Sequence, residues 1–200
     1  MKTKNAAALF ASFKTSRAIP CARPLRRDFM IQSTFDAGVR AIEYHPMVVL
    51  DDHVIRTDAV LVDRDDGRYV VDFVDARPPG DPEAAGLLQL GFEQDSSGIL
   101  SVTTADVGRE PLLSAAREVW RHSTIAVSAG DRAQVLEALE QEGPIPLRAF
   151  AGLVATRRYP IEVVYALACE GSVGIDLTCG LDARAIVRCG DLGLSRRYGT

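Results

Sequence analysis

Apolar positions between residues 41 and 77 cluster into short runs that are typical of strands. Runs at residues 47–50 and 59–62 are followed by a third at residues 69–74. Asp65–Asp66–Gly67, before the third run, is a strong hairpin signal. The centres of the runs are almost continuously apolar, as expected when both faces of a sheet are covered. This pattern predicts a β-meander.

Helical periodicity flanks the meander on both sides. Residues 25–35 have apolar positions spaced as on one face of a short helix, and further helices are predicted at 83–94 and 112–121. A short strand is predicted at 98–103. The order helix, three or four strands, helix, strand, helix predicts an α/β sandwich over residues 25–127.

The periodicity changes after Ser128–Ala129–Gly130, which predicts a domain junction at that point. Three helical segments follow, of which the second and third begin at Pro146 and Pro160, a residue favoured in the first turn of helices. Alternating apolar residues then predict a β-hairpin. This order predicts a winged-helix domain over residues 131–190, followed by a tail at 191–200.

Charge adds a feature at the N-terminus. Residues 1–27 contain seven Lys and Arg side chains and no Asp or Glu, whereas the rest of the chain contains 16 basic and 27 acidic residues. A basic arm over residues 1–24 on an acidic body suits contact with DNA, because Lys and Arg release counterions when they neutralise phosphates. A solvated, frayed terminus accounts for the charge equally well.

Composition excludes several classes of protein. A hydrophobic content of 47% and a mean hydropathy of +0.03 exclude a mainly disordered chain. No apolar run reaches the roughly 18 residues of a membrane span, and the start lacks a secretory signal, so we expect a cytoplasmic protein without membrane contact. The four cysteines form no CxxC pair, so no zinc site is expected.

Several short motifs occur in a recognisable order. Ser12–Phe13–Lys14 with Arg17 is similar to F-x-S-x-K-x-x-R, and Leu25–Arg26–Arg27–Asp28–Phe29 to L-E-R-D-F. His45–Pro46 stands where Q-P is expected, and Thr57–Asp58 where P-D is expected. In order and spacing, these motifs resemble the TnsA-like endonucleases, which cut DNA ends for certain transposons. The resemblance covers nearly the whole chain.

The resemblance implies a restriction-endonuclease-like mixed sheet flanked by helices, a C-terminal winged helix, and Mg²⁺-dependent cleavage of DNA. In this family a helix Glu, a strand Asp and a second acid hold the metal, which activates water, and a Lys two positions further stabilises charge. Asp58 matches the strand Asp. Arg26 stands at the position of the helix Glu, a cation in place of an acid.

The second acid can be matched in two registers. Asp72 follows Asp58 by fourteen residues and leaves Val74 at the Lys position, whereas Asp75 follows it by seventeen and puts Arg77 there. Successive strand residues face opposite ways, so Asp72 and Asp75 cannot both point into one site. The second register implies Asp58 and Asp75 as metal ligands. Both registers stay open.

Replacement of Glu by Arg26 and of Lys by Arg77 leads us to expect weakened or lost cleavage. The alternative to an endonuclease is a non-catalytic DNA-binding or protein–protein adaptor that uses the winged helix. The third helix of that domain offers Glu162, Tyr165 and Glu170 outward, an acidic surface that suits a transposase-like protein partner at least as well as DNA. The side chains expected to contact DNA are Lys14, Arg17, Arg23, Arg27, Arg157 and Arg158.

Overall fold

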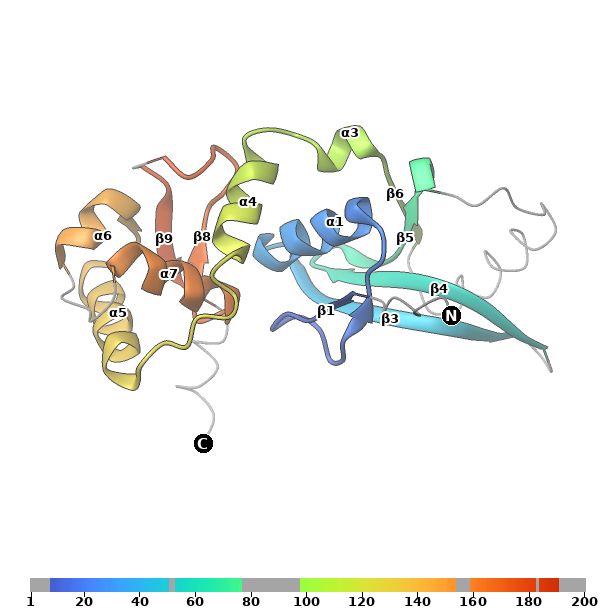
Figure 1. The fold of residues 1–200 in the computed structure, drawn as a ribbon, viewed down its shortest axis with the longest axis horizontal. Helices are drawn as coiled ribbons and strands as arrows, with labels where there is room; N and C mark the ends of the chain where they lie inside the picture. Colours follow the sequence, from blue (N-terminus) through green and yellow to red (C-terminus); the bar gives the residue numbers. More distant parts are fainter. Residues whose placement is uncertain (1–7, 51–52, 77–97, 154–158, 183, 191–200) are drawn as a thin grey trace, which may run out of the picture. The chain divides into compact units, whose positions relative to one another are not determined.

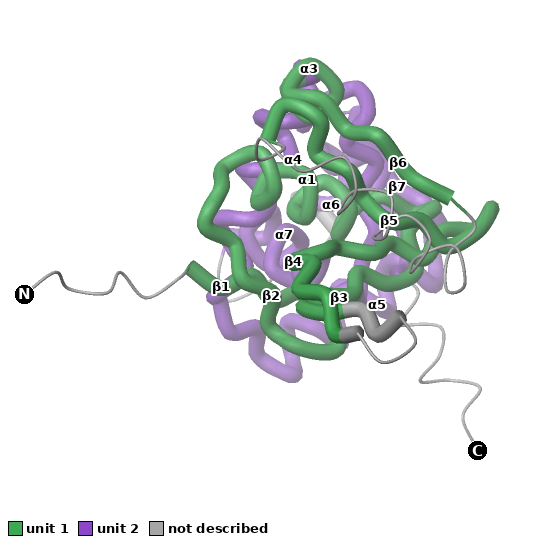
Figure 2. Tube along the Cα trace, turned by 90° about the vertical axis from the view of Figure 1, so that its right-hand side faces the viewer, with its two compact units in different colours: residues 1–108 green, residues 109–200 purple. Residues whose placement is uncertain are grey.

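The computed structural model describes residues 8–50, 53–76, 98–153, 159–182 and 184–190. The chain divides into two compact units, residues 1–108 and 109–200, each with its own sheet (Figure 2). Within the described residues, no helix is both long and apolar enough to cross a bilayer. The helix predicted at 83–94, the tail at 191–200 and the side chains of Arg77, Arg157 and Arg158 lie outside the described residues.

The first unit is built on a four-stranded mixed sheet in the order β3-β4-β5-β6 (Figure 1). The first three strands form the antiparallel meander, and β6 joins β5 in parallel. The expected α/β class with a mixed sheet flanked by helices is therefore confirmed. The elements of this unit are β1 (Leu9–Phe10), β2 (Ile19–Pro20), α1 (Pro24–Phe35), β3 (Val39–Leu50), β4 (His53–Arg64), β5 (Gly67–Phe73), the 3₁₀ turn η1 (Val74–Ala76), β6 (Gly98–Val102) and α3 (Thr104–Val107).

Helix α1 covers one face of this sheet. Val60 pairs with Tyr44 on one side and Val71 on the other, so these side chains share a face with Phe73, two residues further along β5. The ring of Phe73 meets that of Phe29 from α1 edge to face, with centroids 5.5 Å apart. We call this side of the sheet the helix face.

The N-terminal segment is not the free arm that its charge suggested. Phe10, Ile19 and Cys21 are buried, and β1 pairs with β2 in antiparallel fashion. The segment also contacts the edge strand β3 through an isolated bridge between Thr15 and Ile42, where Ile42 donates a backbone hydrogen bond of 2.8 Å to the carbonyl of Lys14. The expected arm over residues 1–24 is thus corrected for residues 8–23, whose apolar side chains anchor the segment in the core.

The second unit combines helices with a small antiparallel sheet in the order β7-β9-β8. Ser128 begins α5 by accepting a hydrogen bond from the backbone of Asp131, and Gly143, at φ +76°, ends it. Pro160 opens α7, as its position predicted. The elements are α4 (Leu112–Trp120), α5 (Ala129–Glu142), β7 (Ile145–Pro146), α6 (Leu147–Leu153), α7 (Pro160–Cys169), β8 (Val173–Ile175) and β9 (Ile186–Cys189).

Helix α4 belongs to the second unit, which corrects the junction expected at residues 128–130. Val119 of α4 is fully buried, and its carbonyl accepts a hydrogen bond of 3.3 Å from the thiol of Cys169 at the end of α7. Burial also raises the pKa of the Cys169 thiol to about 12. The boundary between the units falls after Gly108 instead.

Candidate functional site

An ion pair joins the start of α1 to the middle of the sheet. The Nη1 atom of Arg26 lies 3.0 Å from Oδ2 of Asp58 on β4. The Arg26 side chain is only 10% exposed, whereas that of Asp58 is 68% exposed. Pro24 starts the helix and places Arg26 in its first turn, turned toward the helix face. The two residues that the resemblance matched to the helix Glu and the strand Asp therefore contact each other.

A β-bulge brings Asp58 to this position. His45 pairs with Ala59 and Met47 with Arg56, so that Thr57 and Asp58 together stand opposite Pro46. Proline has no N–H to donate to a ladder, which accounts for the break in pairing. The hydroxyl of Thr57 donates to the carbonyl of His45 and fills the gap. Asp58 itself adopts a left-handed conformation with φ +49°, which Asp tolerates better than most residues do.

Tyr44 completes the site from β3. Its hydroxyl donates a 3.0 Å hydrogen bond to Oδ1 of Asp58, so the two carboxylate oxygens have different donors. The guanidinium carbons of Arg26 and Arg17 lie 5.5 and 5.8 Å from the centroid of the Tyr44 ring. Burial and the hydrogen bond to the Asp58 carboxylate raise the pKa of Tyr44.

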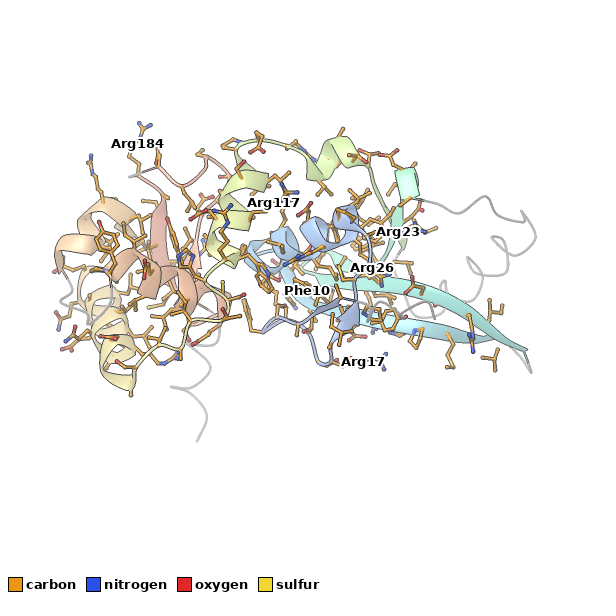
Figure 3. The ribbon with its side chains drawn as sticks, in the orientation of Figure 1. Phe10, Arg17, Arg23, Arg26, Arg117 and Arg184 are labelled. Atoms are coloured by element: carbon orange, nitrogen blue, oxygen red, sulfur yellow. The ribbon has the colours of Figure 1, made fainter. Side chains whose placement is uncertain are left out.

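Three arginines from the N-terminal segment and the first turn of α1 contact β3, β4 and the turn after β5 (Figure 3). Arg17 donates to the carbonyl of Tyr44 on β3, Arg26 pairs with Asp58 on β4, and Arg23 donates to the carbonyl of Ala76 in η1. Arg17 and Arg23 are exposed, as is Arg27 in the first turn of α1. Cations therefore line the side of the sheet where α1 begins.

Neither candidate second acid takes the strand position beside Asp58 on the helix face. Asp72 follows Val71 by one residue, so it faces the side of the sheet opposite the helix face. Strand β5 ends at Phe73, and Asp75 lies beyond it in η1. There its carboxylate accepts a 2.6 Å hydrogen bond from the backbone of Thr104 at the start of α3, which lowers the pKa of Asp75. On the helix face, the strand position beside Asp58 is occupied by Phe73.

These donors do not fit a magnesium ion. One oxygen of Asp58 accepts a hydrogen bond from Tyr44, and the other forms an ion pair with Arg26, whose positive charge would repel a divalent cation. The carboxylate of Asp75 is engaged by the backbone of Thr104 at the start of α3. In the parts of the chain that the structure describes, no three His, Cys, Asp or Glu side chains gather closely enough to hold a metal ion. Arg77, the expected Lys substitute, lies outside the described residues.

Lys14, which we expected to contact DNA, has a different place. It is buried, and its ammonium donates to the carbonyls of Ser33 and Asp36 at 3.1 and 2.5 Å. These carbonyls lie at the C-terminal end of α1, where a cation offsets the helix dipole. Its role is corrected from DNA contact to support of the helix end.

Of the three side chains expected to point outward from α7, Glu162 and Glu170 are partly exposed, but Tyr165 is buried. Every residue from Val163 to Cys169 is buried, including Tyr165, whose ring packs edge to face 5.2 Å from that of His122. Glu170 is paired with Arg132 at 2.5 Å. The burial of α7 against α4 excludes the expected outward position of Tyr165, and it leaves little of this helix to enter a DNA groove in this conformation.

Sequence reasoning missed Tyr44 and the bulge. Pro46 within a strand pattern is the one signal that could have indicated a break in pairing there. His45, at the family's Gln position, lies with Glu43 on the opposite face, where Glu43 accepts from Arg68 at 2.5 Å and lies 3.3 Å from the His45 ring.

No protein-family model matches this chain, and no curated protein matches it significantly. The resemblance to TnsA-like endonucleases therefore rests on the order and spacing of the motifs.

Proposed function

We propose that this chain is a DNA-binding protein related to the TnsA-like endonucleases that has lost Mg²⁺-dependent cleavage. The observation that carries this proposal is the ion pair between Arg26 and Asp58. A guanidinium occupies the place where an acid would complete a metal site, and it holds the carboxylate that would be the other ligand.

Topology supports the two fold assignments within this proposal. In the first unit, a mixed sheet with α1 on one face and the Asp58 cluster at the start of α1 agrees with a restriction-endonuclease-like arrangement. In the second, strand β7 lies between α5 and α6, and α7 leads into the hairpin β8–β9. This order of helices, small sheet and hairpin agrees with a winged helix.

The proposed contact with DNA uses exposed arginines of the first unit. Arg17, Arg23 and Arg27 are exposed, and two of them are held in place by backbone carbonyls. Held guanidinium groups lose less conformational freedom on binding, and each can form a bidentate contact with a phosphate. We therefore expect affinity for the phosphate backbone without sequence readout by α7.

The test measures the affinity of labelled duplex DNA by fluorescence anisotropy over a series of KCl concentrations. Replacing Arg17, Arg23 and Arg27 by Gln should weaken binding by at least about tenfold and flatten the salt dependence by roughly 0.9 for each phosphate that the variant no longer neutralises. The matched control replaces three exposed arginines elsewhere, Arg40, Arg121 and Arg148. Equal weakening in both triple variants, or no binding by the unaltered chain at low salt, would refute the proposal.

A protein-adaptor role for the second unit is the second candidate. Tyr159, just before α7, is 66% exposed, and Ile186 on β9 is also exposed. Exposed aromatic and branched side chains beside a buried helix suit a protein partner better than phosphate. Under this alternative, duplex DNA shows no affinity that depends on Arg17, Arg23 and Arg27.

A further inference from the structure

We propose that Arg26 and Tyr44 form a binding site for a phosphoryl oxyanion, and that the carboxylate of Asp58 is a displaceable occupant of this site. The ligand class is a phosphate group, either free or in a nucleic acid backbone. Only the DNA source rests on the proposed function; the anion site itself rests on the side chains of the first unit.

The first observation is the state of the Arg26 guanidinium. Its Nε and Nη2 atoms are buried, and neither has a hydrogen-bond acceptor among the described residues. The cation contacts the Tyr44 ring, but that contact leaves these N–H groups unpaired. Buried donors without acceptors are costly, most of all in a charged group. Arg26 therefore has hydrogen-bonding capacity for a further anionic oxygen.

The second observation is how Asp58 is held. Oδ2 of Asp58 lies 3.0 Å from Nη1 of Arg26 in an ion pair, and Oδ1 accepts a 3.0 Å hydrogen bond from the hydroxyl of Tyr44. Each oxygen has a second lone pair, but in this geometry Nη2 of Arg26 reaches neither of them. A phosphate group has more oxygens than a carboxylate, so it can take the same two donors and also serve the unpaired N–H groups.

The third observation is that Asp58 can leave without disturbing the core. Its side chain is 68% exposed and lies on a bulge, outside the regular pairing of β3 and β4.

Charge selects an anion for the vacated position. With Asp58 turned away, the guanidinium groups of Arg26 and Arg17 leave two positive charges within 5.8 Å of the centre of the Tyr44 ring, whose hydroxyl is protonated at neutral pH. These charges repel a divalent cation and attract a phosphate, which can accept hydrogen bonds from the Arg26 guanidinium and from the Tyr44 hydroxyl.

The experiment titrates inorganic phosphate into the full-length chain at constant ionic strength and follows binding by ³¹P NMR. Asp58→Gly empties the site and suits the left-handed backbone, so we expect phosphate to bind at least about tenfold more tightly than to the unaltered chain. Asp65→Ala is the matched control, because it removes the partner of Arg40 from an exposed ion pair at 2.8 Å. This control should leave phosphate affinity unchanged.

A second variant tests the donor set without removing the buried arginine. Adding Tyr44→Phe to Asp58→Gly removes one hydroxyl, keeps the ring, and should return phosphate affinity at least most of the way to that of the unaltered chain. Equal affinities in Asp58→Gly, the double variant and Asp65→Ala would overturn the proposal.

Titration of the same variants with duplex DNA distinguishes free phosphate from the phosphates of a nucleic acid backbone. If Asp58→Gly strengthens binding of DNA as well as of free phosphate, the site receives backbone phosphates. If it strengthens free phosphate alone, the ligand is a free phosphate. Loss of DNA binding with retained phosphate binding refutes only the proposed function, and salt-sensitive DNA binding without any phosphate gain in Asp58→Gly refutes only the oxyanion site.

Discussion

Asp58 shows how neighbouring groups hold a single residue in an uncommon backbone conformation. Pro46 interrupts the ladder, Thr57 fills the gap, and the partners of the carboxylate fix its direction. A left-handed conformation costs a residue with a Cβ about 1–2 kcal/mol, whereas glycine adopts it freely. The sequence indicated that Asp58 and Arg26 meet, but not the conformation that makes them meet.

This conformation predicts an order of stability between two variants. Asp58→Gly and Asp58→Ala both lose the ion pair, but Ala also keeps the strained φ, so it should be less stable than Gly by about 1 kcal/mol. Urea unfolding at 25 °C measures the difference. An alanine variant as stable as the glycine variant, or more stable, would show that Asp58 does not hold a left-handed backbone.

The raised pKa of Tyr44 predicts a specific alkaline titration. Because burial and the Asp58 carboxylate disfavour the phenolate, its midpoint should lie above the ordinary value of 10.0. The difference in phenolate absorbance between the unaltered chain and Tyr44→Phe isolates this group. In Asp58→Gly the midpoint should move back toward the ordinary value, and an unchanged midpoint would contradict the hydrogen bond.

The sign of the stability effect follows from the direction of the pKa shift. The folded state holds the Tyr44 proton more tightly than the unfolded state does, so the contribution to stability is complete below the unfolded pKa near 10. It is lost as the pH rises through the higher pKa of the folded state.

At the scale of elements, the apolar runs and Asp65–Asp66–Gly67 were enough to predict the meander and its second hairpin. They could not show that β5 would end at Phe73, because the apolar pattern continues to Val74 while the backbone turns into η1. Because of that ending, Asp75 lies in η1, where its carboxylate accepts a hydrogen bond from the backbone of Thr104 at the start of α3.

The N-terminal segment illustrates a different limit of sequence reasoning. Its excess of charge suggested a uniform arm, whereas the structure gives its cations separate roles. Lys14 supports the end of α1, Arg26 is buried beside Asp58, and Arg17 is exposed. Composition counts charges but does not show which of them are enclosed by the fold.

Because Lys14 supports the end of α1 and Arg17 is exposed, substitution of Lys14 should affect stability and substitution of Arg17 should affect DNA binding. Lys14→Met removes the donor to the carbonyls of Ser33 and Asp36 at the end of α1, of which that of Ser33 is buried, and should lower the free energy of unfolding by about 1–3 kcal/mol, with the salt dependence of DNA binding unchanged. Arg17→Gln should weaken DNA binding with less than about 0.5 kcal/mol change in stability. Chemical unfolding and anisotropy on the same two variants measure both effects. The reverse pattern would contradict the assignment of Lys14 to the helix end.

At the scale of the whole molecule, the chain contains two compact units whose boundary the sequence placed too late. Apolar residues of α4 could have covered either sheet, because periodicity shows that a helix has a buried side but not what covers it. The hydrogen bond between Val119 and Cys169 assigns α4 to the second unit.

This assignment predicts which fragment can fold. A fragment spanning residues 109–200 retains α4 against α7 and should unfold cooperatively on heating, as followed by circular dichroism. A fragment spanning 128–200 exposes the apolar side of α7 that α4 covers and should lose the cooperative transition. Equal melting of both fragments would show that α4 is dispensable to this unit.

The central claim is that the Arg26–Asp58 pair stands in place of a metal site, so that the chain binds DNA without cleaving it. Incubation of supercoiled plasmid with the full-length chain and Mg²⁺ or Mn²⁺ tests it, when samples are run on gels with and without removal of the protein. We predict retarded plasmid before protein removal and intact supercoiled plasmid after it. Nicked or linear plasmid produced by the unaltered chain but not by Asp58→Ala would contradict the claim.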